Sequence, residues 1–266
     1  MLAWPLLSRR IAAARRLEIV LDYDGTLVPI ASHPSRATLS SRTRTLLATI
    51  ARRPDCSLVL VSGRTVRDLK RMVRVRGLGY AGNHGLEIDG EPSLARRLAR
   101  HRPVLRRLAR ELSSALRAVP GAWVEDKRAT LSIHWRAVRA ASVRRFHALL
   151  THHLAPLSKQ GRVRVTYGKR VVEVRPPIAW DKGSLVRWWR RHMGKRSHGD
   201  ALVVYCGDDR TDEAAFAAVN RRGGLSVFVG RPPHGTQARW RLENPQAVQG
   251  LLATIVGTRC QSSRTR

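Results

Sequence analysis

Two aspartates stand two residues apart at the end of an apolar run in the segment IVLDYDGTLVPI, residues 19–30. Burying one unpaired carboxylate is costly, and burying two side by side is worse. Asp22 and Asp24 must therefore either be solvated or have a positive group between them. A bound cation is the first chemistry that such a pair suggests.

Further polar clusters occur where other apolar runs end or where a helical pattern begins. They are Ser62-Gly63-Arg64, Lys182-Gly183 and Gly207-Asp208-Asp209. Ligands of an open parallel sheet bind at the carboxyl ends of its strands, so we expect Asp22, Asp24, Asp208 and Asp209 to converge with Lys182. Four carboxylates and one lysine call for a hard divalent cation, and oxygen-only ligands favour Mg²⁺.

Each cluster also has a simpler interpretation when it is taken alone. The DYDGT segment can be a turn with a capping aspartate, and SGR can be the N-cap of a helix. The GDDRTDE segment can be an acidic helix start that the helix dipole stabilises. Because all the clusters fall at predicted strand ends or a helix start, we interpret them jointly as one site.

The elements that must position these residues alternate between strands and helices. Apolar runs without polar alternation predict buried parallel strands at 17–23, 56–62, 201–206 and 225–229. Helical patterns lie near 39–53, 65–75, 182–193 and 212–221. This alternation predicts an α/β fold with a parallel sheet.

The middle of the chain has a different pattern. Residues 94–118 resemble one arginine-rich amphipathic helix, 122–136 alternate like a hairpin, 138–154 look helical, and 162–167 and 170–174 look like two strands. Helices with antiparallel strands form an α+β unit. We therefore expect a discontinuous core domain, 1–87 and 179–266, with a second domain inserted at 88–178.

The clusters together resemble the four motifs of the haloacid-dehalogenase superfamily phosphatases. The resemblance implies that Asp22 is a nucleophile that forms an aspartyl-phosphate and that Asp24 is the general acid and base. Lys182, Ser62 and Mg²⁺ would neutralise the phosphoryl group. The metal would be held by the Asp22 side chain, the backbone carbonyl of Asp24 and Asp208.

The spacing of the motifs narrows the class within this superfamily. Asp22 and Ser62 are 40 residues apart, which is too few for a helical cap domain, whereas Ser62 and Lys182 are 120 apart. In the superfamily, an insertion at the second position is the larger kind of lid, often found on sugar phosphatases. The implied fold is a Rossmann-like parallel-sheet core of the haloacid-dehalogenase type with an inserted α+β lid domain.

The inserted segment carries a more specific resemblance. Together with GDDRTDEAAF (207–216), three segments are similar to the trehalose-6-phosphate phosphatases: GNHGLEI (82–88), VEDKRATLSIHWR (124–136) and GKRVVEVRPPIAWDKGSLV (168–186). The family's reaction is the Mg²⁺-dependent hydrolysis of trehalose 6-phosphate, the last step of trehalose biosynthesis.

The same resemblance assigns roles in substrate binding. It implies that the sugar phosphate is bound by Glu125, Lys127, Arg136 and Glu173, with Arg64 from the core, and that His134 supports them. The lid residues could instead form a cross-strand ladder of ion pairs. A phosphatase of a related substrate, such as glucosyl-glycerate or mannosyl-glycerate phosphate, is the alternative enzyme.

The charge of the chain raises a different class of function. The sequence has 50 lysines and arginines against 19 acidic residues, a formal net charge of +31. Such a field attracts anions, and a nucleic-acid-binding protein on this fold is the competing hypothesis. The basic residues are scattered, and an aromatic content of 5% is thin for base stacking. We expect a sugar phosphate and no nucleic acid as the partner.

The remaining features bear on location. The cysteines show no metal or redox spacing, which suits a reducing cytoplasm. Residues 1–16 are apolar and then basic, the reverse of a secretory signal, although they have some features of an arginine-rich transit peptide. No apolar run approaches the length of a membrane span. We expect a cytoplasmic monomer without membrane association.

Overall fold

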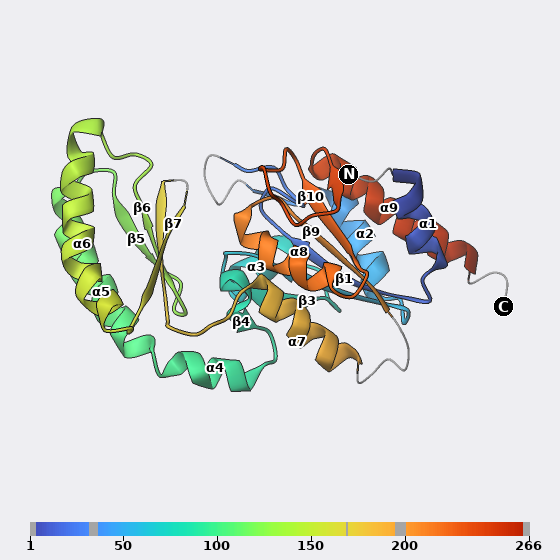
Figure 1. The fold of residues 1–266 in the computed structure, drawn as a ribbon, viewed down its shortest axis with the longest axis horizontal. Helices are drawn as coiled ribbons and strands as arrows, with labels where there is room; N and C mark the ends of the chain where they lie inside the picture. The colour runs from blue at the N-terminus through green and yellow to red at the C-terminus, as the bar shows by residue number, and fades with distance from the viewer. Residues whose placement is uncertain (1–3, 32–36, 169, 195–200, 263–266) are drawn as a thin grey trace. The chain divides into compact units, whose positions relative to one another are not determined.

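The chain folds into two compact units. The structure, a computed structural model, describes residues 4–31, 37–168, 170–194 and 201–262. The first unit comprises Met1–Asp89 and Trp180–Arg266, and the second comprises Gly90–Ala179. We call them the parallel-sheet unit and the inserted unit and describe each by itself (Figure 1).

The parallel-sheet unit contains a sheet of seven strands in the described part of the chain, in the order β11-β10-β9-β1-β2-β3-β4. The strands are β1 (Arg16–Asp22), β2 (Cys56–Val61), β3 (Gly79–Gly82), β4 (Glu87–Ile88), β9 (Ala201–Gly207), β10 (Leu225–Val229) and β11 (Trp240–Leu242). All neighbours are parallel except β3 and β4. The predicted α/β fold and its four buried strands are confirmed. The short strands β3, β4 and β11 were not predicted.

The strand order places a topological switch point beside β1. This strand lies between β2 and β9, with Leu17 opposite Cys56 on one side and Leu21 opposite Cys206 on the other. The chain proceeds outward through β2 and β3, and it returns to the other side of β1 through β9. Loops that leave β1 and β9 therefore diverge, which opens the position where ligands of such sheets bind.

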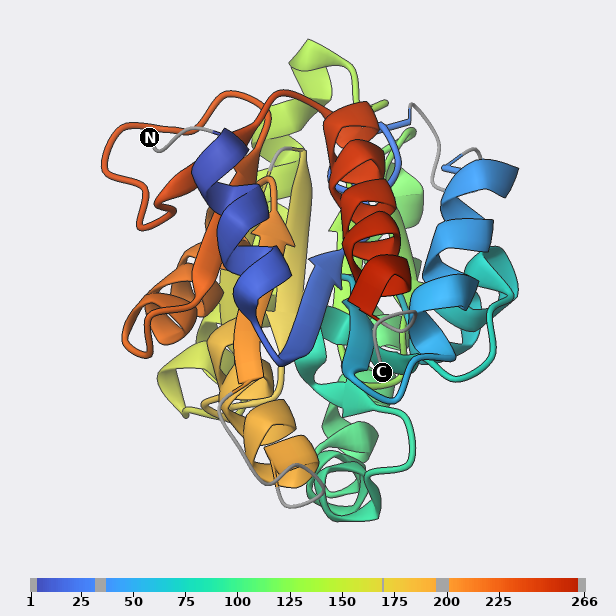
Figure 2. The same ribbon diagram turned by 90° about the vertical axis from the view of Figure 1, so that its right-hand side faces the viewer.

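Helices cover both faces of this sheet. They are α1 (Trp4–Ala13), α2 (Ser41–Ala51), α3 (Val66–Val73), α7 (Lys182–Gly194), α8 (Glu213–Asn220) and α9 (Pro245–Ser262). Of these, α1, α2 and α9 lie on one face, where Leu7 and Ile11 of α1 join the core with Ile19 (Figure 2). On the other face Glu18 pairs with Arg190 of α7. In the described residues no helix is long and apolar enough to cross a bilayer.

In its described residues the inserted unit contains a four-stranded antiparallel sheet with two helices packed on one face. Its strands, in the order β5-β6-β8-β7, are β5 (Trp123–Asp126), β6 (Leu131–His134), β7 (Arg164–Gly168) and β8 (Val171–Arg175). Its α-helices are α4 (Pro92–Ala99), α5 (Arg102–Ala115) and α6 (Val143–Lys159). Leu112 of α5 and Phe146 of α6 pack on Ile133 and Val172 of the sheet.

The single helix expected over 94–118 is wrong, because two helices occupy this stretch. The first, α4, ends at Ala99, and α5 begins at Arg102. Pro103 lies in the first turn of α5. A proline there has no N–H to donate, and its ring clashes with the carbonyl four residues earlier, so a continuous helix cannot pass through it.

Candidate active site

A buried lysine joins two aspartates at the carboxyl end of the parallel sheet. Lys182, the first residue of α7, donates from Nζ to Asp22 Oδ1 at 2.8 Å and to Asp212 Oδ1 at 2.7 Å. All three side chains are nearly inaccessible to solvent. Because buried charges must be paired, the two carboxylates fix the ammonium group beside the predicted nucleophile.

Asp212 is the residue of this site that the sequence analysis missed. Its Oδ1 also accepts a hydrogen bond from the Tyr205 hydroxyl, and its Oδ2 accepts from the backbone N–H groups of Asp208 at 3.1 Å and Asp209 at 3.0 Å. A Cβ on Gly207 would lie 2.2 Å from the Asp212 carboxyl carbon, so glycine makes room for it. In the sequence, Asp212 is the third acidic residue of the GDDRTD segment, and its position in a predicted helix start did not distinguish it from a surface residue.

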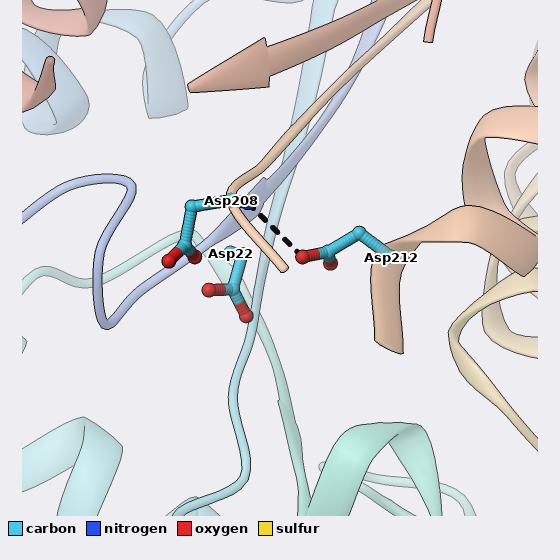
Figure 3. Close-up of side chains that lie close together, drawn as sticks. All are labelled: Asp22, Asp208 and Asp212. Atoms are coloured by element: carbon cyan, nitrogen blue, oxygen red, sulfur yellow. Dashed lines mark hydrogen bonds between the residues drawn. The ribbon is translucent and has the colours of Figure 1, made fainter. Parts of the chain in front are cut away.

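Asp22, Asp208 and Asp212 form an acidic cluster in which each residue offers one carboxylate oxygen within 4.8 Å of those of the other two (Figure 3). Asp208 Oδ1 accepts a hydrogen bond from Thr26 Oγ1 at 3.3 Å. The loop after β1 reaches Asp208 through Gly25, whose φ is +86° and where a Cβ would lie 2.0 Å from Asp208 Oδ2. Only glycine meets both requirements without strain.

The electrostatics of the cluster favour a bound cation. Burial raises the pKa of Asp22 well above its usual range, and Asp212 and Asp208 add to the effect while Lys182 opposes it. Burial, with Asp212 next in importance, raises the pKa of Asp208 to about 7. Burial lowers the pKa of Lys182, but the Asp212 and Asp22 carboxylates outweigh it and leave that pKa above its ordinary value. The carboxylates of Asp22, Asp208 and Asp212 outnumber the one ammonium group of Lys182, so a bound cation would stabilise the cluster.

The Asp24 carboxylate is not a member of this cluster, which corrects the expected convergence of four carboxylates. Arg64 donates from Nε to Asp24 Oδ2 at 2.8 Å and from Nη2 to Oδ1 at 2.6 Å. Ser62 Oγ donates to the same Oδ2 at 3.2 Å. Bidentate pairing with a guanidinium is strong and directional, and it holds the Asp24 side chain toward the loop after β2. Metal binding through the Asp24 backbone carbonyl stays a prediction.

Asp209 does not join the cluster either. Its Oδ1 accepts from the Thr211 backbone N–H at 2.7 Å and from Thr211 Oγ1 at 2.6 Å. It thereby caps the short 3₁₀ helix η5 (Arg210–Asp212). The interpretation of this segment as an acidic helix start therefore holds for Asp209, which caps the helix. An exposed aspartate satisfies helical N–H groups at a lower cost than that of entering a buried acidic site.

A strained loop supports the backbone of Ser62 and Arg64. Asn83 and His84 both adopt the left-handed backbone region, with φ of 50° and 57°. The Asn83 N–H donates to the Arg64 carbonyl at 2.7 Å, and the His84 N–H donates to the Ser62 carbonyl at 2.9 Å. Such conformations are uncommon for residues with side chains and concentrate at functional sites. The segment GNHG thus fixes the loop that carries Ser62.

In the inserted unit, three of the four predicted sugar-binding residues lie together on the sheet face opposite α5 and α6. Lys127 Nζ lies 3.8 Å from Glu125 Oε2 and 3.5 Å from Glu173 Oε1. His134 Nε2 lies 2.9 Å from Glu125 Oε2, and Ser132 Oγ donates to Glu173 Oε1 at 2.6 Å. These contacts include the cross-strand ion pairs that were the alternative interpretation.

The fourth residue, Arg136, is separate. It follows the end of β6 with an exposed side chain, and it takes no part in the ion pairs that link Lys127 to the two glutamates. Lys169, which belongs to the quoted GKRVVEV segment, lies outside the described residues.

The parallel sheet, with its acidic cluster at the switch point, has the fold of a haloacid dehalogenase-like hydrolase from Bacteroides thetaiotaomicron, with a TM-score of 0.59 and 20% identity. The chain belongs to the trehalose-phosphatase family, whose profile matches residues 20–246. The resemblance expected from the motifs is confirmed.

Individual relatives agree with this assignment. The probable trehalose-phosphate phosphatase 4 of Oryza sativa subsp. japonica is 33% identical over 255 residues, which cover 94% of this chain and 68% of the rice protein. Trehalose-phosphate phosphatase B of Arabidopsis thaliana is 31% identical over 257 residues, covering 92% and 67%. The C-terminal domain of the trehalose-6-phosphate phosphatase of C. albicans shares the fold, with a TM-score of 0.75, 22% identity and coverage of 96% and 98%.

Proposed function

We propose that this protein hydrolyses trehalose 6-phosphate to trehalose and phosphate. The observation that carries the proposal is the hydrogen bond between Lys182 and Asp22 at the switch point of the sheet, in a chain of the trehalose-phosphatase family. A carboxylate nucleophile needs no base to activate it, but it needs a phosphoryl group whose charge has been neutralised. Lys182 supplies a fixed positive charge beside Asp22.

The acidic cluster suits Mg²⁺. Its three side chains offer oxygen atoms alone, and its members come within the span of one coordination sphere. Burial, with the neighbouring carboxylates as a smaller contribution, raises the pKa values of Asp22 and Asp208, so a bound cation would stabilise their ionised forms. We therefore infer that Asp22 and Asp208 hold Mg²⁺, with Asp212 beside them. The ion would neutralise charge on the phosphoryl oxygens.

The first chemical step is attack on phosphorus by the Asp22 carboxylate. Lys182 occupies Oδ1 of this carboxylate and fixes its orientation. A bond forms between the carboxylate and phosphorus, and the bond between phosphorus and the sugar oxygen breaks. The electron pair leaves with the sugar oxygen, which takes a proton from Asp24. The products of this step are trehalose and an aspartyl-phosphate.

The second step restores the enzyme. Asp24, now a carboxylate, accepts a proton from a water molecule as that water attacks phosphorus. The bond between phosphorus and Asp22 breaks, and inorganic phosphate leaves. Ser62 and Arg64 hold Asp24 in this role, because together they engage both of its oxygens.

We propose that the inserted unit acts as the lid and recognises the sugar. Glu125 and Glu173 are acceptors for sugar hydroxyl groups, and Lys127 lies between them. Arg136 would contribute from the turn after β6. We further propose that the enzyme is a cytoplasmic monomer. The cysteines of the sequence show no metal or redox spacing, which suits a reducing location.

Phosphate release from a panel of substrates tests this function. The panel contains trehalose 6-phosphate, glucosyl-glycerate phosphate, mannosyl-glycerate phosphate and glucose 6-phosphate, each with Mg²⁺ and with excess EDTA. We expect the highest kcat/KM for trehalose 6-phosphate and no turnover in EDTA. A higher kcat/KM for another member would replace the proposed substrate, and full activity in EDTA would overturn the metal assignment.

A further inference from the structure

An exposed tryptophan lies on the same sheet face as the predicted sugar-binding glutamates. We call this face the polar sheet face and define it by Trp123, Glu125, Ser132, His134, Thr166 and Glu173. Trp123 begins β5 and is 49% exposed. The exposed indole offers an apolar face beside hydrogen-bonding side chains, and tryptophan is enriched at interfaces for this reason.

The Trp123 ring is held in a defined orientation. It stacks on the ring of its cross-strand partner His134, with centroids 4.1 Å apart and an angle of 16° between the planes. His134 Nε2 in turn lies 2.9 Å from Glu125 Oε2. Three side chains on two neighbouring strands thus form one connected group, in which a carboxylate fixes the imidazole and the imidazole fixes the indole. Such fixed side chains lose little entropy when a ligand binds.

The residues of the polar sheet face lie in two adjacent rows across the strands. Trp123 and His134 share one row. The next row, in spatial order, is Glu125, Ser132, Glu173 and Thr166. Residues two apart on a strand are about 7 Å apart. The indole ring of Trp123 therefore lies in the row next to the carboxylates of Glu125 and Glu173 and the hydroxyl groups of Ser132 and Thr166.

This combination matches the chemistry of a pyranose ring. The C–H groups on the face of the ring are apolar and can stack on an indole, whereas its hydroxyl groups project from the edge and need acceptors. We propose that Trp123 is a specificity-determining residue that stacks on a pyranose ring of the substrate, and that His134 positions it. The inference rests on the proposed function, because it concerns how that enzyme recognises its sugar.

Three variants test the inference. Trp123→Ala removes the aromatic ring, and Trp123→Phe keeps a smaller one. Tyr167→Ala is the matched control, because Tyr167 is 70% exposed in the same sheet but is paired with Val172, which packs into the core on the opposite face. For each we would measure KM and kcat for trehalose 6-phosphate, kcat/KM for p-nitrophenyl phosphate, and the melting temperature.

We expect Trp123→Ala to raise KM for trehalose 6-phosphate roughly five- to tenfold, which is the usual worth of an aromatic contact. Its kcat and its hydrolysis of p-nitrophenyl phosphate should stay within about twofold of wild type, since the latter substrate has no pyranose. Trp123→Phe should recover most of the affinity. Tyr167→Ala should leave KM unchanged.

Two results would overturn the inference while leaving the proposed function intact. One is an unchanged KM in Trp123→Ala. The other is an equal loss on both substrates together with a lower melting temperature, which would mean that the pair of rings only stabilises the sheet. If the wild-type protein prefers another sugar phosphate, trehalose 6-phosphate is not its substrate. The role of Trp123 is then tested by the KM of the same variants for the preferred sugar phosphate. A wild type that hydrolyses no sugar phosphate overturns both proposals.

Discussion

Arg64 holds Asp24 through two parallel hydrogen bonds, with Nη2 2.6 Å from Oδ1 and Nε 2.8 Å from Oδ2. The carboxylate is thus oriented by a planar donor that lysine cannot imitate. We expect Arg64→Lys, which keeps the charge, to lower kcat by roughly 10- to 100-fold. Steady-state kinetics would measure the change in kcat. The control is Arg67→Ala on the exposed side of α3. Equal activities of the two variants would show that the paired hydrogen bonds between Arg64 and Asp24 are not needed for catalysis.

Asp22→Asn should abolish turnover by several orders of magnitude, because the amide cannot attack phosphorus. The fold should survive, since Asn Oδ1 can still accept from Lys182. Burial and two neighbouring carboxylates disfavour the charge of Asp22, so the melting temperature of the metal-free variant should equal or exceed that of wild type. Phosphate release and thermal melting measure the two effects. More than a few per cent of residual activity would remove Asp22 from the nucleophilic role.

The stability of the metal-free protein should depend on the protonation of Asp208. The pKa of this residue is raised to about 7 in the folded state, against about 4 for an unfolded aspartate. The folded state therefore binds the proton more tightly. Its contribution to stability is complete below about pH 4 and is lost as the pH rises through about 7.

We therefore expect the melting temperature in excess EDTA to fall from pH 5 to pH 8. Mg²⁺ binds the ionised carboxylate, so it should oppose this fall. Asp208→Asn is the matched control, because it removes the titrating group and leaves all others in place. If the variant and the wild type show the same pH slope in EDTA, Asp208 is not the group responsible.

The lid glutamates should matter for sugar substrates and not for the chemistry itself. Glu125→Ala and Glu173→Ala should each lower kcat/KM for trehalose 6-phosphate about 10²-fold, because binding energy that positions the substrate is lost. Hydrolysis of p-nitrophenyl phosphate should change less than about threefold. Glu111→Ala is the control, since Glu111 pairs with Arg107 on α5 and lies away from the polar sheet face. Equal losses on both substrates would favour the ion-pair ladder as a purely structural device.

Gly25→Ala should disturb the acidic cluster. A Cβ at this position would lie 2.0 Å from Asp208 Oδ2, and the φ of +86° adds backbone strain of about 1–2 kcal/mol. We expect a melting temperature about 4 °C lower, or more, and a higher Mg²⁺ requirement for activity. Gly90→Ala is the control, because Gly90 has a φ of +76° but no atom within 4 Å of its Cβ position. If the two variants behave alike, strain alone accounts for the effect and the contact with Asp208 does not.

Several features of this protein could be predicted from local sequence. Continuous apolar runs predicted the central strands, and the change to alternating and helical patterns after residue 88 predicted an inserted α+β region. Asp22, Lys182 and Asp208 stood at the ends or beginnings of those elements, so their approach followed from the general rule for parallel sheets. The short strands β3, β4 and β11 were missed because GYAG, EI and WRL are too brief to carry a period.

Only the tertiary structure decided which carboxylates share the cluster. Asp209 and Asp212 belong to one acidic segment, yet the first caps a helix in solvent and the second is buried against Lys182 and Tyr205. The Asp24 side chain likewise pairs with Arg64 and does not join the acidic cluster. The partners of a buried charge come from elements that are distant in the chain: Lys182 begins α7, Asp22 ends β1 and Asp212 lies in η5. A sequence motif supplies the candidates for such a site, whereas the competition among hydrogen-bond donors in three dimensions determines where each carboxylate points.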